Sequence, residues 1–333
     1  MSDAATRSDG GESGWFARTR SRPPRRALDW AASAVDAGAR VVGVRALRGA
    51  GNAMHVVAVA HDGATRRVVL RRVMSAEPAV VAARGWVARE AAVLVALARH
   101  GAPVPEVLAV DPDGSRCDCP AIVMTLLPGW GRPPRRAAPA WLDSLAATLH
   151  GLHAGPPDRL PPLPDRLAEL TGELAGPPPP SDTDRSTDEA ARELLGRRLA
   201  ELAAAGSVPA VLVHDDYWSG NTLRLGHRVT GVVDWQTAAL GPPGLDVGYC
   251  AIDLELSYGK EARDHFVAAY ERLAGAPVER LAVWELAGVL RCADIAVWTS
   301  GWAELGLPVT EEIVAQRLAA LEERVTTALR DDH

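Results

Sequence analysis

The sequence predicts a two-lobed α+β protein, with a small N-terminal lobe built on an antiparallel sheet and a larger, mainly helical C-terminal lobe. Short valine-rich runs separated by turn residues dominate the chain up to Leu127, whereas amphipathic helical patterns dominate the remainder. The change falls at Pro128-Gly129, so we expect lobes at residues 27–129 and 130–333. A chain of 333 residues has room for two cores, because single cores rarely exceed about 250–300 residues.

The N-terminal lobe is expected to follow a tail, residues 1–26, whose Ser, Gly, Arg and Pro content is typical of disorder. A helix is predicted from Ala27. Turns at Gly49-Ala50-Gly51-Asn52 and His61-Asp62-Gly63 then separate three strands, and a long alanine-rich helix follows until Gly101 and Pro103 end it. The strands are expected at 41–47, 53–59 and 67–73, the long helix at 79–100, and two further strands at 107–110 and 121–127.

The C-terminal lobe is expected to be helical because apolar residues recur at helical spacing along its length. In its first helix, for example, Leu142, Leu145 and Leu149 share one face. A single strand-loop-strand unit, residues 211–234, interrupts this pattern. The helices are predicted at 141–153, 188–204, 262–273, 281–302 and 309–329.

Composition restricts the class of partner. The net charge of −6 argues against nucleic-acid binding, which usually requires a basic face. The chain has no run of roughly 18 apolar residues that could cross a membrane, and residues 1–26 lack the apolar stretch of a secretory signal. Its four cysteines fit reduced thiols. We therefore expect a cytoplasmic protein that binds neither nucleic acid nor a membrane, while the oligomeric state stays open.

Residues suited to phosphoryl transfer are concentrated between 211 and 234. An apolar strand leads into a loop with His214, Asp216 and Asn221, and a second apolar run ends on Asp234, thirteen residues after Asn221. Phosphoryl transfer needs a carboxylate near the attacking hydroxyl, oxygen ligands for Mg²⁺ and positive charge on the phosphates. Asp216 can accept the hydroxyl proton, and Asn221 and Asp234 offer hard oxygen ligands. Asp and Asn are also ordinary turn residues, but the chain has only two asparagines, so a correctly spaced one is informative.

This spacing is similar to that of the catalytic and metal loops of protein kinases. The local sequence resembles the aminoglycoside phosphotransferase family, also called the phosphotransferase enzyme family, at three segments: His214-Asp215-Asp216, Ser219-Gly220-Asn221 and Asp234-Trp235. It departs from the family at Asp215, where Gly is common and protein kinases have Arg. The resemblance covers about residues 40–310 and implies a protein-kinase-like fold. It also implies transfer of the γ-phosphoryl group of ATP, with Mg²⁺, to a hydroxyl of a small molecule such as an antibiotic, a reaction associated with antibiotic resistance.

The resemblance further implies a basic residue on the third strand that holds the nucleotide phosphates. Family members use a lysine there, but Lys260 is the only lysine in this chain. Arg71 takes the position, or Arg72 if the register is shifted by one residue. Glu90, on the following helix, is the expected partner of this arginine.

Other nucleotide contacts are implied in the same lobe. Gly51 and Asn52 lie in the turn where the family's nucleotide loop sits, although a plain hairpin turn is an alternative. The carbonyl of Thr125 and the N–H of Leu127 are expected to meet the adenine edge. An apolar slot for the ring is expected from three side chains: Val59, Val69 and Met124.

His214 is expected to anchor the catalytic loop rather than to act as a base, and Asp246, at a helix start, is expected to bind the loop backbone through its carboxylate. Asp253 and Glu255, with Glu261, follow the catalytic unit and can receive a cationic substrate, although solvated helix faces also carry such residues. A competing class is a catalytically silent nucleotide-binding module, which the missing lysine and the atypical Asp215 favour. Within the enzyme class, the identity of the acceptor and the choice between ATP and GTP stay open.

Overall fold

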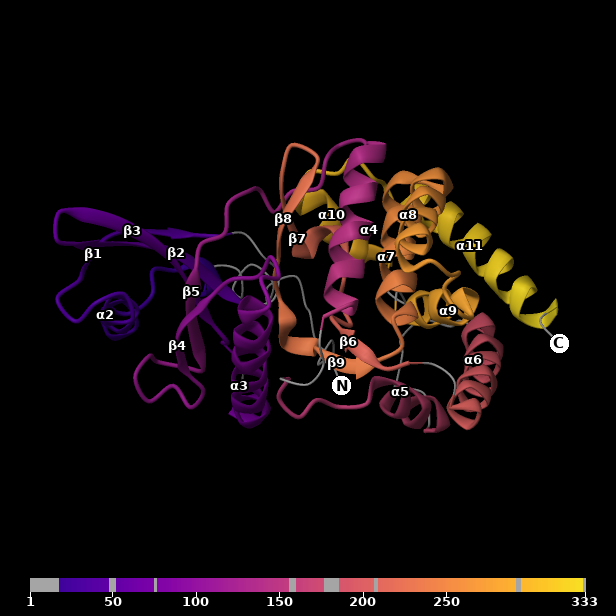
Figure 1. The fold of residues 1–333 in the computed structure, drawn as a ribbon, viewed down its shortest axis with the longest axis horizontal. Coiled ribbons are helices and arrows are strands. Elements are labelled where there is room, and N and C mark those ends of the chain that lie inside the picture. The colour runs from indigo at the N-terminus through magenta and orange to yellow at the C-terminus, as the bar shows by residue number, and fades with distance from the viewer. Residues whose placement is uncertain are drawn as a thin grey trace. The chain divides into compact units, whose positions relative to one another are not determined.

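The computed structural model describes residues 18–47, 52–74, 77–155, 160–176, 186–206, 209–291 and 295–331. The chain divides into two compact units (Figure 1): unit 1 runs to Arg99 and includes Val104–Leu127, and unit 2 comprises His100–Pro103 and Pro128–His333. Unit 1 contains a five-stranded antiparallel sheet and unit 2 is mainly helical, which confirms the predicted α+β fold class. Among the described helices, none combines the length and apolar character that a membrane span needs.

The predicted tail, residues 1–26, is described only in part, because residues 1–17 lie outside the described residues. Thr19 is buried, and helix α2 (Arg25–Ser33) begins two residues before the expected helix start. Pro24 precedes the helix with φ −62°, a backbone angle that suits the residue at a helix N-terminus.

The sheet of unit 1 has the strand order β1-β2-β3-β5-β4 and is antiparallel throughout. Strands β2 and β3 are joined by Asp62-Gly63, whose φ angles of 46° and 75° match the two-residue turn that suits twisted hairpins. The strands are β1 (Arg40–Ala46), β2 (Ala53–His61), β3 (Ala64–Arg72), β4 (Val107–Asp111) and β5 (Ala121–Thr125).

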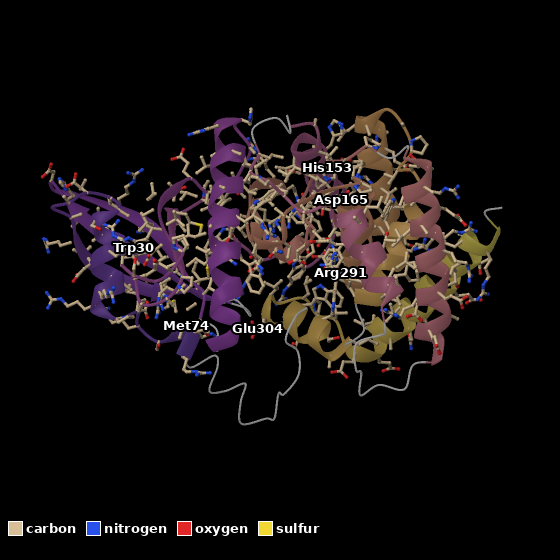
Figure 2. All side chains as sticks on the ribbon, turned by 90° about the horizontal axis from the view of Figure 1, so that it is seen from below. Trp30, Met74, His153, Asp165, Arg291 and Glu304 are labelled. Atoms are coloured by element: carbon tan, nitrogen blue, oxygen red, sulfur yellow. The ribbon has the colours of Figure 1, made fainter. Side chains whose placement is uncertain are left out.

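Two helices cover opposite faces of this sheet (Figure 1). Trp30 of α2, labelled in Figure 2, belongs to a cluster with Val68 on one face. Val87 of α3 (Glu77–Arg99) belongs to a cluster with Val69 on the other face. Because side chains alternate along a strand, Arg71 lies on the α3 side with Val69.

Unit 2 contains helices and two small sheets. Strand β6 (Val211–Val213) pairs with β9 (Ala239–Gly241), and β7 (Thr222–Leu225) pairs with β8 (Arg228–Val232). The strand-loop-strand unit predicted at 211–234 is thus a strand, a loop and a hairpin, because the chain turns back at Gly226, where φ is 60°. The helices are α4 (Pro139–His153), α5 (Arg166–Ala175), α6 (Ser186–Ala205), α7 (Gly244–Tyr258), α8 (Lys260–Ala274), α9 (Leu281–Arg291), α10 (Ile295–Glu304) and α11 (Glu311–Asp331). The single helix predicted at 281–302 corresponds to α9 and α10, and residues 292–294 between them lie outside the described residues.

Helix α7 lies at the centre of unit 2 (Figure 1), and the sequence indicated a helix start at Asp246 but predicted no range for this helix. Every residue from Gly244 to Ser257 is buried. A helix that is buried all round has no polar face, so the stripe that identifies an amphipathic helix is absent from its sequence. This helix carries the carboxylates that hold the catalytic loop.

Helices α7 and α9 approach closely at glycines. A Cβ on Gly248 would lie 2.7 Å from the backbone carbon of Trp284, and one on Gly288 would lie 2.4 Å from Ile252 Cδ1. We expect Gly248→Ala to destabilise the protein by about 1–3 kcal/mol, because two packed helices would have to separate. Differential scanning calorimetry should show a lower melting temperature. Gly172→Ala on α5 is the matched control, because no atom lies within 4 Å of its added Cβ; equal melting temperatures for the two variants would contradict the close approach.

Candidate active site

The loop after β6, residues 214–221, brings the predicted catalytic residues together within unit 2. Its backbone turns at Asp215, where φ is 58°. Aspartate is among the few non-glycine residues that adopt this left-handed conformation readily. A single turn of 3₁₀ helix, Ser219–Asn221, completes the loop. The loop therefore has a fixed course on both sides of Asp216.

Two carboxylates of α7 hold the backbone of this loop. Asp246 accepts the N–H of His214 at 2.7 Å through Oδ2 and the N–H of Asp215 at 2.8 Å through Oδ1. Seven residues along the helix, Asp253 accepts the N–H of Ser219 at 3.0 Å. The contact expected between Asp246 and the loop backbone is thus present, and Asp253 provides a second one.

His214 connects the loop to the segment that follows β8. Its Nε2 lies 2.9 Å from the carbonyl oxygen of Val233, and because a carbonyl can only accept, His214 is the donor. The N–H of Val233 donates to the carbonyl of Asn221 at 3.0 Å. Asp234 comes next and is left-handed, with φ 68°. These bonds place Asp234 in the chain segment paired with Asn221.

Asn221 and Asp216 are in direct contact. The Nδ2 of Asn221 donates to the backbone oxygen and to Oδ2 of Asp216, each at 2.9 Å. Both partners are acceptors, which fixes the amide nitrogen on their side and turns Oδ1 away from them. Burial raises the pKa of Asp216 to about 6, Arg291 and His214 oppose this shift, and repulsion from Asp234 adds to it.

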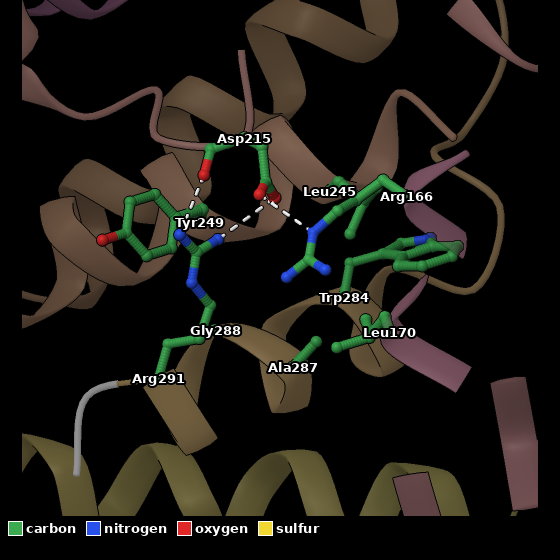
Figure 3. A pocket seen from close by; sticks show the side chains of 9 residues that line it. All are labelled: Arg166, Leu170, Asp215, Leu245, Tyr249, Trp284, Ala287, Gly288 and Arg291. Carbon is green, nitrogen blue, oxygen red and sulfur yellow. Dashed lines mark hydrogen bonds and ion pairs between the residues drawn. The ribbon is translucent and has the colours of Figure 1, made fainter. Parts of the chain in front are cut away.

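Asp215 lies between two arginines from different helices (Figure 3). Its Oδ2 accepts from Arg166 Nε at 2.9 Å, and its Oδ1 lies 3.2 Å from Arg291 Nη1. Arg291 also donates to the backbone oxygen of Asp215 at 2.8 Å and stacks 4.5 Å above the ring of Tyr249. Burial raises the pKa of Asp215, and both arginines oppose that shift. Asp at this position is therefore compatible with the loop, because its charge is paired and its backbone tolerates the left-handed turn.

The expectation that Asp253 and Glu255 receive a cationic substrate is corrected. Asp253 is fully buried, and its second oxygen accepts from Trp302 Nε1 at 2.8 Å. Glu255 is 5% exposed and is paired with Arg324 at 2.6 Å. Both lie on the all-buried helix α7, so their carboxylates are used inside the protein.

In unit 1, Arg71 and Glu90 form an ion pair between β3 and α3 and are only 3% and 2% exposed. Arg72 lies on the opposite face of β3, where its Nε donates to Asp118 Oδ1 at 2.8 Å. Arg71 is thus the arginine that the third strand presents to Glu90. Its contact with nucleotide phosphates stays a prediction.

The remaining nucleotide-binding residues are in part outside the described residues, because Gly51 is not among them. Asn52 directly precedes β2 and is half-buried. Strand β5 ends at Thr125, whose N–H donates to the carbonyl of Glu106 at 2.9 Å. Leu127, the last residue of unit 1, is half-buried.

The predicted adenine slot is wrong in one of its three members. Val69 and Met124 share the α3 face of the sheet, whereas Val59 belongs to the cluster on the α2 face. Val56 is paired with Val69 across β2 and β3 and so lies on the correct face. Because successive side chains of a strand lie on opposite faces of the sheet, an error of one residue in the prediction places the side chain on the wrong face.

Sequence reasoning missed His153, Arg166 and Arg291. The Nε2 of His153 lies 3.2 Å from Asp246 Oδ2 and its Nδ1 lies 2.7 Å from the hydroxyl of Tyr270. Figure 2 labels His153 and Arg291 within unit 2. The only signal was the position of His153 at the end of a predicted helix. Nothing local marks the two arginines, because their partner Asp215 is far away in the sequence.

The sequence model of the phosphotransferase enzyme family matches residues 45–284. No curated protein matches the chain. Macrolide 2′-phosphotransferase MphH from Brachybacterium faecium, as the apoenzyme, is 22% identical with a TM-score of 0.55, covering 88% of this chain and 97% of that one. A thermostable mutant of aminoglycoside phosphotransferase APH(4)-Ia, in a ternary complex with ADP and hygromycin B, is 19% identical with a TM-score of 0.53 and coverages of 88% and 95%. A choline/ethanolamine kinase family protein from Mesorhizobium loti is 18% identical with a TM-score of 0.51 and coverages of 84% and 92%. At these identities the likeness shows the fold, which is the predicted kinase-like one.

Proposed function

Because the chain belongs to the phosphotransferase enzyme family, and is therefore a phosphotransferase with an alcohol group as acceptor, we propose that it is an ATP-dependent small-molecule kinase. The observation that carries this proposal is the contact between Asp216 and Asn221 in a loop whose backbone is held by α7. Preorganised carboxylate and amide groups are what phosphoryl transfer requires of a protein.

Asp216 is the proposed catalytic residue. Its carboxylate positions the acceptor hydroxyl and takes its proton as the oxygen attacks the γ-phosphorus, while the bond from that phosphorus to the bridging oxygen breaks and ADP leaves. Asn221 Oδ1 and the Asp234 carboxylate are hard oxygen donors that fit Mg²⁺, which commonly keeps waters and uses one or two carboxylates with substrate phosphates. When bound there, Mg²⁺ supplies charge neutralisation on the phosphates.

Unit 1 is proposed to bind the nucleotide. Arg71 would hold the phosphates, with Glu90 fixing its side chain through the buried ion pair. A guanidinium can contact a phosphate through two N–H groups, whereas the usual lysine acts as a point charge. Asn52, Thr125 and Leu127 keep their proposed roles at the phosphates and the adenine edge.

Two observations weigh against the silent-module alternative. Arg71 is the proposed substitute for the missing lysine, and its ion pair with a glutamate of the adjacent helix supports that role. The atypical Asp215 has its own partners, Arg166 and Arg291, and leaves the adjacent Asp216 in contact with Asn221.

Transfer of label from γ-labelled ATP to a panel of hydroxylated antibiotics and metabolites tests the proposed function. We expect a phosphorylated acceptor whose formation stops when Mg²⁺ is chelated and resumes when Mg²⁺ is restored, because the phosphates then regain their neutralising cation. If calorimetry shows that nucleotide binds but no acceptor is labelled and no ATP is hydrolysed, the result would favour the catalytically silent nucleotide-binding module over the kinase.

A further inference from the structure

A cavity of about 510 Å³ opens among the helices of unit 2. Its walls come from the end of α7, the start of α8, the segment before α4, the segment before α11, and α11 itself. The volume falls within the range of small-molecule sites, roughly 300–1,000 Å³. The cavity is therefore large enough for a complete small-molecule acceptor.

The cavity and the catalytic loop lie along the same helix. Asp253 of α7 accepts the backbone N–H of Ser219 in the loop. One turn later, Ser257 donates its hydroxyl to the carbonyl of Asp253 and lines the cavity beside Tyr258. One helical turn advances about 5.4 Å along the axis. The wall of the cavity at Ser257 therefore lies one helical turn from the residue of α7 that contacts the loop.

The charged side chains that line the cavity are mostly cationic. They include three arginines, Arg135, Arg136 and Arg317, but a single carboxylate, Glu261. Among the described residues, none of these arginines has a carboxylate partner. Arg317 is held in place by donating to the carbonyl of Leu256 at 2.8 Å, and Glu261 is the one carboxylate that shares the cavity wall with it.

We propose that this cavity binds the phosphate acceptor, and that the acceptor carries an oxyanion, a carboxylate or a phosphate, which these three arginines bind. The proposal rests on the kinase function proposed above. Guanidinium groups bind planar carboxylates and phosphates through paired hydrogen bonds. They also repel polycations, and the two acidic residues expected to attract such substrates, Asp253 and Glu255, are buried and paired elsewhere.

Acceptor charge provides the first test. Phosphate transfer from γ-labelled ATP is measured with hydroxy acids and sugar phosphates, with neutral sugars and macrolides, and with aminoglycosides. We expect label in the first set. Preferential labelling of an aminoglycoside or a neutral compound, lost in Asp216→Asn, would overturn the proposal while supporting the kinase function.

Arginine substitutions provide the second test, on whichever acceptor is labelled. Arg317→Gln, and separately the double variant Arg135→Gln/Arg136→Gln in an exposed segment, should raise the KM for the acceptor by about 10–100-fold. The effect on kcat should be smaller, because these side chains bind the substrate away from the reacting atoms. Arg197→Gln, on the exposed surface of α6, is the matched control and should leave KM unchanged. An unchanged KM in both cavity variants would overturn the proposal.

A binding measurement separates this proposal from the kinase function. Glucose 6-phosphate, glucose and glucosamine share a ring and differ in charge. We expect glucose 6-phosphate alone to raise the melting temperature of the wild type, with the increase lost in Arg135→Gln/Arg136→Gln and kept in Arg197→Gln. That result without any phosphate transfer would support the anion site and contradict the kinase function. No increase with glucose 6-phosphate, or an equal one with glucosamine, would contradict the anion site.

Discussion

Replacement of Asp216 by Asn should lower kcat by about 10²–10⁴-fold, the range that a positioned general base contributes. The amide keeps the size of the carboxylate but cannot take the proton of the acceptor hydroxyl. The fold should be unaffected, because the loop backbone is held by Asp246 and Asp253 rather than by Asp216 itself. Steady-state kinetics with a labelled acceptor measures kcat, and calorimetry of nucleotide binding checks that the ATP site persists.

The matched control for this variant is Asp62→Asn. Asp62 is also left-handed, with φ 46°, but its side chain is 92% exposed in a hairpin turn of unit 1. Its turnover should equal that of the wild type. Retention of full turnover by Asp216→Asn, with the labelled product intact, would remove Asp216 from the reaction and require a different proton acceptor.

Replacement of Asp246 by Ala should both destabilise unit 2 and reduce turnover. The substitution leaves the buried N–H groups of His214 and Asp215 without their acceptor and removes the contact with His153. Hydrogen bonds to charged groups contribute about 1.5–3 kcal/mol each, so the two N–H bonds together predict a loss of about 3–6 kcal/mol. For a domain of the size of unit 2 that corresponds to a fall in melting temperature of about 6–24 °C. Turnover should fall at temperatures where the variant is folded, because Asp216 follows directly on the two released residues.

Two further variants make this result specific. Asp246→Asn keeps one side-chain acceptor and should lie between Ala and the wild type in both melting temperature and kcat. Asp264→Asn, on the outer part of α8 with its side chain 43% exposed, should melt close to the wild type. Melting of Asp246→Ala within a degree of the wild type would show that the loop holds its course without α7.

The sequence was informative where local patterns decide the structure. Valine runs and the Asp62-Gly63 turn indicated the hairpin of β2 and β3, and the spacing of Asp216 and Asn221 indicated a loop in which the two side chains are in contact. Local patterns fail where burial is complete, as in α7, since no polar face marks the helix. The misassignment of Asp253 and Glu255 follows from that gap, because nothing in the local sequence distinguishes a buried acidic residue from one on a solvated helix face.

Two other features could not be predicted from the sequence: the sheet face on which a strand side chain lies, and the contacts between residues that are distant in sequence. Val59 was predicted to line the adenine slot, but Val56 is the residue of β2 that lies on the same face as Val69. Only the register of β2 with β3 shows which residues share that face. The contacts of Arg166 and Arg291 with Asp215 join residues distant in sequence, and no periodicity or motif encodes such a meeting.

The position of Asp215 between Arg166 and Arg291 has an evolutionary consequence. Glycine, common at this position in the family, would keep the left-handed turn but leave two neighbouring guanidiniums without the carboxylate they share. Arg166 would keep its ion pair with Glu173, and Arg291 its contact with Tyr249, but both would lose the one carboxylate that joins them, and the aspartate is costly to bury without them. The three positions should therefore change in concert among relatives, so that sequences with glycine here also lack one or both arginines.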